Sequence, residues 1–150
     1  MRVVIDPGLV LRALVRPAGE ERALRRAWQG GLIRPLVSPT LATVLMRALS
    51  YPALGLGPAQ QQELLADFLP YAEVVKPAPA ARIRALTVDQ QALVDLSLQG
   101  MAAVLLCDAP SLSDWAARSR SPAARQLCEV RSTEAWIGGL SPSQRGALLC

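Results

Sequence analysis

Three aspartates stand at positions where their carboxylates could share one metal ion. Asp6 comes directly after the β-branched run Arg2–Ile5. Asp108 comes at the end of the apolar run Ala102–Leu106, after one cysteine, and Asp89 lies in the first turn of the predicted helix that leads into that run. Open parallel sheets bind ligands beyond the carboxyl ends of their strands. If the two runs are neighbouring strands, the three carboxylates converge at one edge of a sheet.

The chemistry open to such a group is set by what the sequence lacks. The chain has no histidine, which excludes serine–histidine and cysteine–histidine catalysis. Its three cysteines form no CxxC pair, which argues against a zinc site. Carboxylate oxygens favour Mg²⁺ or Mn²⁺, which bind substrate phosphate and lower the pKa of bound water. Convergent aspartates would therefore suit phosphodiester hydrolysis.

Each acid also has a purely structural interpretation. Asp6 precedes Pro7-Gly8 and could be a turn residue. Asp89 would oppose the dipole of its helix, and Asp108 could form an Asx turn. Asp95 stands six residues after Asp89 on the same helix, so we expect it to point away from the site. It is the joint placement of the three acids that favours a functional role.

Composition describes one compact domain. The 150 residues are 51% hydrophobic and 19% charged. A chain of this length and composition can bury a hydrophobic core without disulfides or structural metal ions. The net charge of +4 is compatible with RNA binding, although an arginine-rich composition also fits a GC-biased coding sequence. An odd number of cysteines, no secretion signal and no long apolar stretch predict a cytoplasmic protein without a membrane span.

Two basic stretches are candidate contacts for RNA phosphates. Arg22, Arg25 and Arg26 fall on one side of a predicted helix, where an ordinary solvated face is the commoner explanation. The residues Arg118, Arg120 and Arg125 form a second stretch, expected in a mobile loop. Neither stretch contains interleaved aromatics for base stacking.

Strand and helix patterns alternate along the chain, which predicts an α/β fold with a parallel sheet. Pro17 and Gly19 separate the first two helices, and Lys76–Ala81 reads as an extended connector. The expected strands cover residues 2–5, 32–37, 72–75, 102–106 and 126–130. The expected helices cover residues 9–15, 20–28, 40–49, 59–69 and 87–99, with others after residues 110, 132 and 141.

Several of these segments resemble PIN domains, and most closely the VapC-like putative toxins. Met1–Asp6 is similar to the first strand and acid of the family, and Leu36–Pro39 to its second strand and following helix. Val88–Leu98 and Ala103–Asp108 are similar to its third and fourth acid segments. The resemblance covers about residues 1–139 and leaves 140–150 as a C-terminal short helix or tail.

This resemblance implies a three-layer α/β fold with a short parallel central sheet of four to five strands flanked by helices. It implies RNA cleavage that depends on Mg²⁺ or Mn²⁺, with Asp6, Asp89 and Asp108 as metal ligands and catalytic residues. It also implies a toxin–antitoxin system in which the toxin forms a homodimer and a small antitoxin protein occupies the acidic groove.

The chain departs from the family pattern at several of these positions. Asp6-Pro7-Gly8 stands where the family has Asp-Thr-Asn or Asp-Ser-Asn, and the second family acid, a glutamate, falls at Val44. No acid lies between Arg34 and Gln62 to replace it. Losing outer-shell support alone costs about 10–100-fold in metal affinity or activity. We therefore expect a PIN-like protein with weakened or lost metal binding and nuclease activity, or an inactive module that binds protein or RNA.

Overall fold

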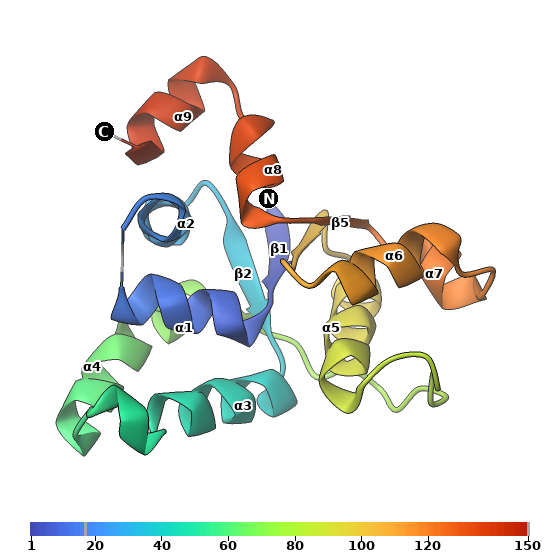
Figure 1. The fold of residues 1–150 in the computed structure, drawn as a ribbon, viewed down its shortest axis with the longest axis horizontal. Helices are drawn as coiled ribbons and strands as arrows, with labels where there is room; N and C mark the ends of the chain where they lie inside the picture. Colours follow the sequence, from blue (N-terminus) through green and yellow to red (C-terminus); the bar gives the residue numbers. More distant parts are fainter. Residues whose placement is uncertain (17, 150) are drawn as a thin grey trace.

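A computed structural model describes residues 1–16 and 18–149 and shows five parallel strands with helices on both faces (Figure 1). Pro17 and Cys150, the former predicted to separate two helices, lie outside the described residues. The strands, in the spatial order β3-β2-β1-β4-β5, are β1 (Arg2–Ile5), β2 (Arg34–Val37), β3 (Glu73–Val74), β4 (Val104–Leu106) and β5 (Glu129–Arg131). The predicted parallel α/β sheet is confirmed, and it is consistent with a PIN-like three-layer fold.

Helices connect every pair of successive strands, and two 3₁₀ turns add to the helices between β2 and β3. The helices are α1 (Pro7–Val15), α2 (Glu20–Gln29), α3 (Pro39–Leu49), α4 (Pro58–Ala66), α5 (Val88–Gln99), α6 (Pro110–Arg118), α7 (Pro122–Gln126), α8 (Thr133–Gly138) and α9 (Pro142–Leu149), with 3₁₀ turns η1 (Pro52–Leu54) and η2 (Leu69–Tyr71).

The central strand β1 supplies side chains to two hydrophobic cores, one on each face of the sheet. Val3 and Ile5 pack with α1, α2 and α8, whereas Val4 packs with α5 and α6. Successive side chains of a strand point to opposite faces, so this short apolar run is buried on both sides. The sheet therefore holds the carboxyl ends of its strands firmly in place.

Helix caps explain where several helices begin. The Ser38 hydroxyl accepts a hydrogen bond of 3.2 Å from the backbone N–H of Leu41, and Pro39 occupies the first helical position of α3. Thr87 and Gln90 form the expected capping box at the start of α5. Both caps were predicted from the sequence, and both helix starts lie next to possible ligand-binding edges.

Two local predictions were wrong. Asp6–Gly8 is not a turn that stops β1: Asp6 caps α1, its carboxylate accepts from the Gly8 N–H, and Pro7 already begins the helix. The basic stretch after α6 is not all loop either, because Ser121 caps α7 and Arg125 lies within that helix. As a result the last strand begins at Glu129 rather than Gln126.

The C-terminal helix α9 packs against α2. The Arg26 guanidinium donates to the carbonyl of Leu148 at 3.1 Å, and the Leu148 side chain is buried in the same core as α1 and α2. Figure 1 shows α9 lying across the end of the molecule beside α2. Within residues 1–16 and 18–149, no helix combines the length and apolar character needed to cross a bilayer.

Candidate functional site

The strands β1 and β4 are direct neighbours, as the sequence argument required. Ile5 pairs with Leu106 in register, so Asp6 and Asp108 come at adjoining carboxyl ends. The backbone N–H of Asp6 donates to the Leu106 carbonyl at 3.0 Å. The sheet thus brings two of the three predicted acids to one edge. We call this edge, formed by Asp6, Cys107 and Asp108, the acidic rim.

Asp108 has protein partners on both of its carboxylate oxygens. Oδ2 accepts a hydrogen bond of 3.0 Å from the Arg12 guanidinium, which comes from α1. Oδ1 accepts one of 3.0 Å from the backbone N–H of Thr133 at the start of α8. The Asp108 and Arg12 side chains are about half exposed, at 44% and 54%. A divalent ion that binds Asp108 would meet the positive charge of the Arg12 guanidinium, which is already hydrogen-bonded to Oδ2.

Asp6 is also engaged by its neighbours. Oδ1 accepts from the backbone N–H of Gly8 at 3.2 Å, and Oδ2 accepts from the Cys107 thiol at 3.5 Å. Burial, and then the nearby Asp6 and Asp108 carboxylates, raise the pKa of the Cys107 thiol to about 11. The protonated Cys107 thiol is therefore a hydrogen-bond donor to Asp6. Sequence analysis did not identify it as part of the rim.

Asp89 occupies the second position of α5 and is exposed. The adjoining Gln90 reaches α6 instead, where its amide donates to the Ser111 hydroxyl at 2.9 Å. Over the residues that the structure describes, no three Cys, Asp or Glu side chains gather closely enough to hold a metal ion. The three-carboxylate group expected from the sequence is not formed there, and the metal-binding and catalytic roles of Asp6, Asp89 and Asp108 stay predictions.

Two further acids lie near Asp108 that sequence analysis did not place at the rim. Burial raises the pKa of Glu20, and so do the nearby charges of Glu134, Glu21 and Asp108, in that order. Glu20 begins α2 and Glu134 lies in α8, so only the folded arrangement brings them toward the end of β4. Within the described chain, the one buried side-chain oxygen without a hydrogen-bond partner is the Thr133 hydroxyl.

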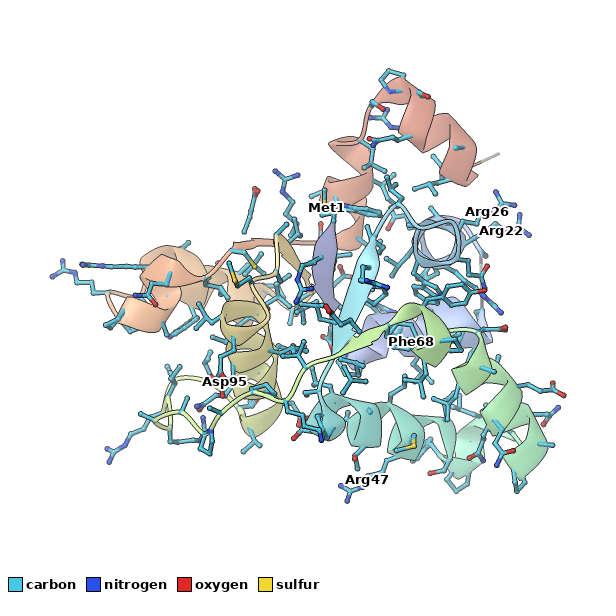
Figure 2. All side chains as sticks on the ribbon, turned by 180° about the vertical axis from the view of Figure 1, so that it is seen from behind. Met1, Arg22, Arg26, Arg47, Phe68 and Asp95 are labelled. Atoms are coloured by element: carbon cyan, nitrogen blue, oxygen red, sulfur yellow. The ribbon has the colours of Figure 1, made fainter. Side chains whose placement is uncertain are left out.

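The first predicted basic stretch, on α2, is used largely for contacts within the protein. Arg25 forms an ion pair with Asp67, and Arg26 donates to the Leu148 carbonyl. Arg22 remains exposed on the same helix, and Figure 2, which looks nearly along α2, shows Arg22 and Arg26 on the same side of it. The helix α2 therefore offers few guanidinium groups to RNA phosphates. This weakens the prediction that the first basic stretch contacts RNA.

Exchanging Arg12 for glutamine should change the free energy of unfolding by less than about 1 kcal/mol, because ion pairs between exposed side chains contribute little. Urea denaturation would measure the change, with Arg16→Gln, at the C-cap of α1, as the control. A loss well above that of the control would show that the Arg12–Asp108 pair is a major structural contact. A small loss would leave Arg12→Gln usable as a probe of the site.

The rim therefore contains two aspartates at the ends of neighbouring strands, a buried thiol that donates to Asp6, and an arginine that neutralises Asp108. Its third predicted acid lies on a different helix end without a described contact to either. Comparison of the chain with protein-family models, with curated proteins and with solved structures gave no match.

Proposed function

We propose that this chain is a PIN-like domain protein, similar to the VapC-like putative toxins, whose ribonuclease centre is too incomplete for efficient RNA cleavage. One observation carries the proposal: both oxygens of Asp108 are bonded within the protein, to Arg12 and to the Thr133 N–H. The acid that would face Asp6 across the rim is thereby neutralised by a guanidinium of the same chain.

The donor set is a poor fit to a two-metal centre. Mg²⁺ binds through one or two carboxylates together with water and substrate phosphate, whereas a two-metal clamp needs more ligands. Asp6 and Asp108 are the residues that would hold a single Mg²⁺ or Mn²⁺, but each already accepts two hydrogen bonds. Val44 supplies no carboxylate from α3. Metal binding at this rim should be weak.

The function that remains for the scaffold is binding in the cytoplasm, and we propose RNA as its ligand. Arg118, Arg120 and Arg125 are exposed around the junction of α6 and α7, and their guanidinium groups make no hydrogen bond or ion pair with other described residues. Free guanidinium groups next to each other suit phosphate contacts. A small antitoxin protein and a second copy of the chain are the alternative partners.

The enzymatic half of the proposal is tested by incubating the protein with structured and single-stranded RNA in the presence of Mn²⁺. Asp6→Asn/Asp108→Asn and Arg12→Gln variants are run beside the parent. We expect no cleavage that depends on the two aspartates. Cleavage by the parent that disappears in the double variant would overturn the proposal in favour of a nuclease. Cleavage only in Arg12→Gln would show that Arg12 alone blocks a competent site.

The binding half is tested by filter binding of the same RNAs without metal. Neutralising Arg118, Arg120 and Arg125 together to glutamine should weaken RNA binding and reduce its dependence on salt, since each phosphate contact contributes to the salt slope. Neutralising three other exposed arginines, Arg16, Arg47 and Arg84, provides the control with the same change of charge. Equal loss in both variants would indicate a general charge effect, and no RNA binding by the parent would favour a protein partner.

A further inference from the structure

A cavity of about 360 Å³ lies away from the acidic rim, between the start of α3, the connector that follows β3 and the middle of α5. Its walls include Ser38–Thr40, Lys76–Pro79 and the side chains of Ala92 and Asp95. It opens beyond the carboxyl ends of β2 and β3, whereas Asp6 and Asp108 follow β1 and β4. A cavity of this size falls at the small end of the range for small-molecule sites.

The connector that forms one wall is fixed to α5 by Gln99. Its side-chain carbonyl accepts from the backbone N–H of Ala78 at 2.6 Å, and its amide donates to the Ala78 carbonyl at 2.9 Å. A primary amide thus replaces the pairing that a neighbouring strand would supply to this extended segment. The cavity wall between Lys76 and Pro79 is held in place without secondary structure of its own.

Gln91 fixes the same connector further along the chain. Its amide donates to the Ala81 carbonyl at 2.8 Å, and its carbonyl accepts from the Ile83 N–H at 2.8 Å and from the Arg82 guanidinium at 2.7 Å. The Gln91 side chain is buried, with the residue 7% exposed. Since both ends of the segment are tied down, the cavity is formed before any ligand arrives, which lowers the entropic cost of binding.

Asp95 lies between these two glutamines on the same face of α5, because residues 91, 95 and 99 are spaced by four. Figure 2 shows Asp95 on α5 beside the connector. Its carboxylate is half-buried and lines the cavity; burial raises its pKa, while a hydrogen bond with Gln91 lowers it. The glutamines bind the connector, and Asp95, beside Gln91, lines the open space between them.

Lys76 supplies the opposite charge on another wall of the same cavity. It is the single lysine of the chain, and its ammonium makes no ion pair or hydrogen bond with any residue in the described ranges. Lys76 and Asp95 therefore line one cavity without pairing with each other there. A molecule that carries both charges could satisfy both groups at once.

We propose that this cavity binds a small zwitterion of the α-amino-acid class, with its carboxylate at Lys76 and its ammonium at Asp95. The proline rings of Pro77 and Pro79 and the methyl group of Ala92 give the side chain of the ligand an apolar surface. Thr40, at the start of α3, adds a hydroxyl and a helix end that favour the carboxylate. This site is independent of the proposed function of the acidic rim.

The test is a titration followed by ¹H–¹⁵N correlation spectra, with free L-α-amino acids that span small, branched and long side chains. N-acetyl and carboxamide derivatives of the tightest binder remove one charge each. The protein variants Asp95→Asn and Lys76→Gln are compared with the matched controls Asp114→Asn, an exposed position on α6, and Arg84→Gln on the same connector. The spectra of the variants also report whether each one folds.

We expect at least one amino acid to shift the amides around the cavity, with each blocked derivative and each cavity variant binding about 10-fold more weakly or worse. The two control variants should bind as the parent does. The proposal is overturned if no amino acid shifts these amides at millimolar concentration. It is equally overturned if a blocked derivative binds as tightly as the free amino acid, or if Asp95→Asn binds like the parent.

Discussion

Replacing Trp28 by alanine is expected to lower the free energy of unfolding by about 3–5 kcal/mol, the range for large aromatic deletions in a core. Trp28 is 1% exposed at the centre of the core formed by α1, α2 and one face of the sheet. Its ring meets Phe68 edge-on, with centroids 5.1 Å apart and an interplanar angle of 76°. Its indole N–H also donates to the Asp67 carbonyl at 2.8 Å. Figure 2 shows Phe68 in the segment after α4.

The loss should have two separable parts. Trp28→Ala removes the whole ring and leaves the Asp67 carbonyl without its donor, whereas Trp28→Phe removes the donor but keeps most of the ring volume. Urea denaturation would rank the parent, Trp28→Phe and Trp28→Ala in that order of stability. Trp115→Ala, at a partly exposed position on α6, is the matched control and should cost less. Equal losses at the two sites would contradict the assignment of Trp28 to the main core.

Replacing Gln91 by alanine is expected to release the connector and to lower the free energy of unfolding by about 1–3 kcal/mol. The reason is that the Ala81 carbonyl, the Ile83 N–H and the Arg82 guanidinium all lose a partner whose side chain is buried. Hydrogen exchange of the Ile83 amide should become faster even under native conditions. Gln62→Ala, an exposed glutamine of α4, should leave both measurements unchanged.

The Gln91→Ala variant also distinguishes the structural role of the connector from its role in ligand binding. Gln91→Ala should weaken amino-acid binding because it frees the cavity wall, although Gln91 itself does not line the cavity. Asp95→Asn should weaken binding while the Ile83 amide stays protected. If Gln91→Ala leaves hydrogen exchange at Ile83 unchanged, the hydrogen bonds of Gln91 are not what orders the connector.

Much of the fold could be predicted because its signals are local. The N-caps Ser38 and Thr87 act on backbone groups within three residues, and the apolar runs of β1 and β4 are short and uninterrupted. The same Ser-Pro signal at Ser121-Pro122 was overlooked because the arginines around it suggested a loop. Asp6 was similarly assigned to a turn, although Asp followed by Pro also begins helices.

The candidate site was less predictable because its decisive contacts join distant segments. The sequence places Asp6 and Asp108 at strand ends, but nothing in it indicates that Arg12 from α1 and the Thr133 N–H from α8 reach Asp108. Asp95 was set aside because its spacing from Asp89 puts the two on different faces of α5. Its spacing from Gln91 and Gln99 was the informative relation, and the role of that face depends on where the connector runs.

The position of β1 has a consequence for how the chain is made. The first strand to be synthesised is the middle strand of the sheet, with β2 on one side and β4 on the other. Residues up to β3 can assemble three strands, while the far edge of β1 stays open until Val104–Leu106 has emerged. An open strand edge is a template for pairing with other chains. A ribosome stalled between β3 and β4 would therefore expose a three-stranded sheet with an unpaired edge at β1. The nascent protein is most prone to aggregate while the residues between β3 and β4 are being synthesised.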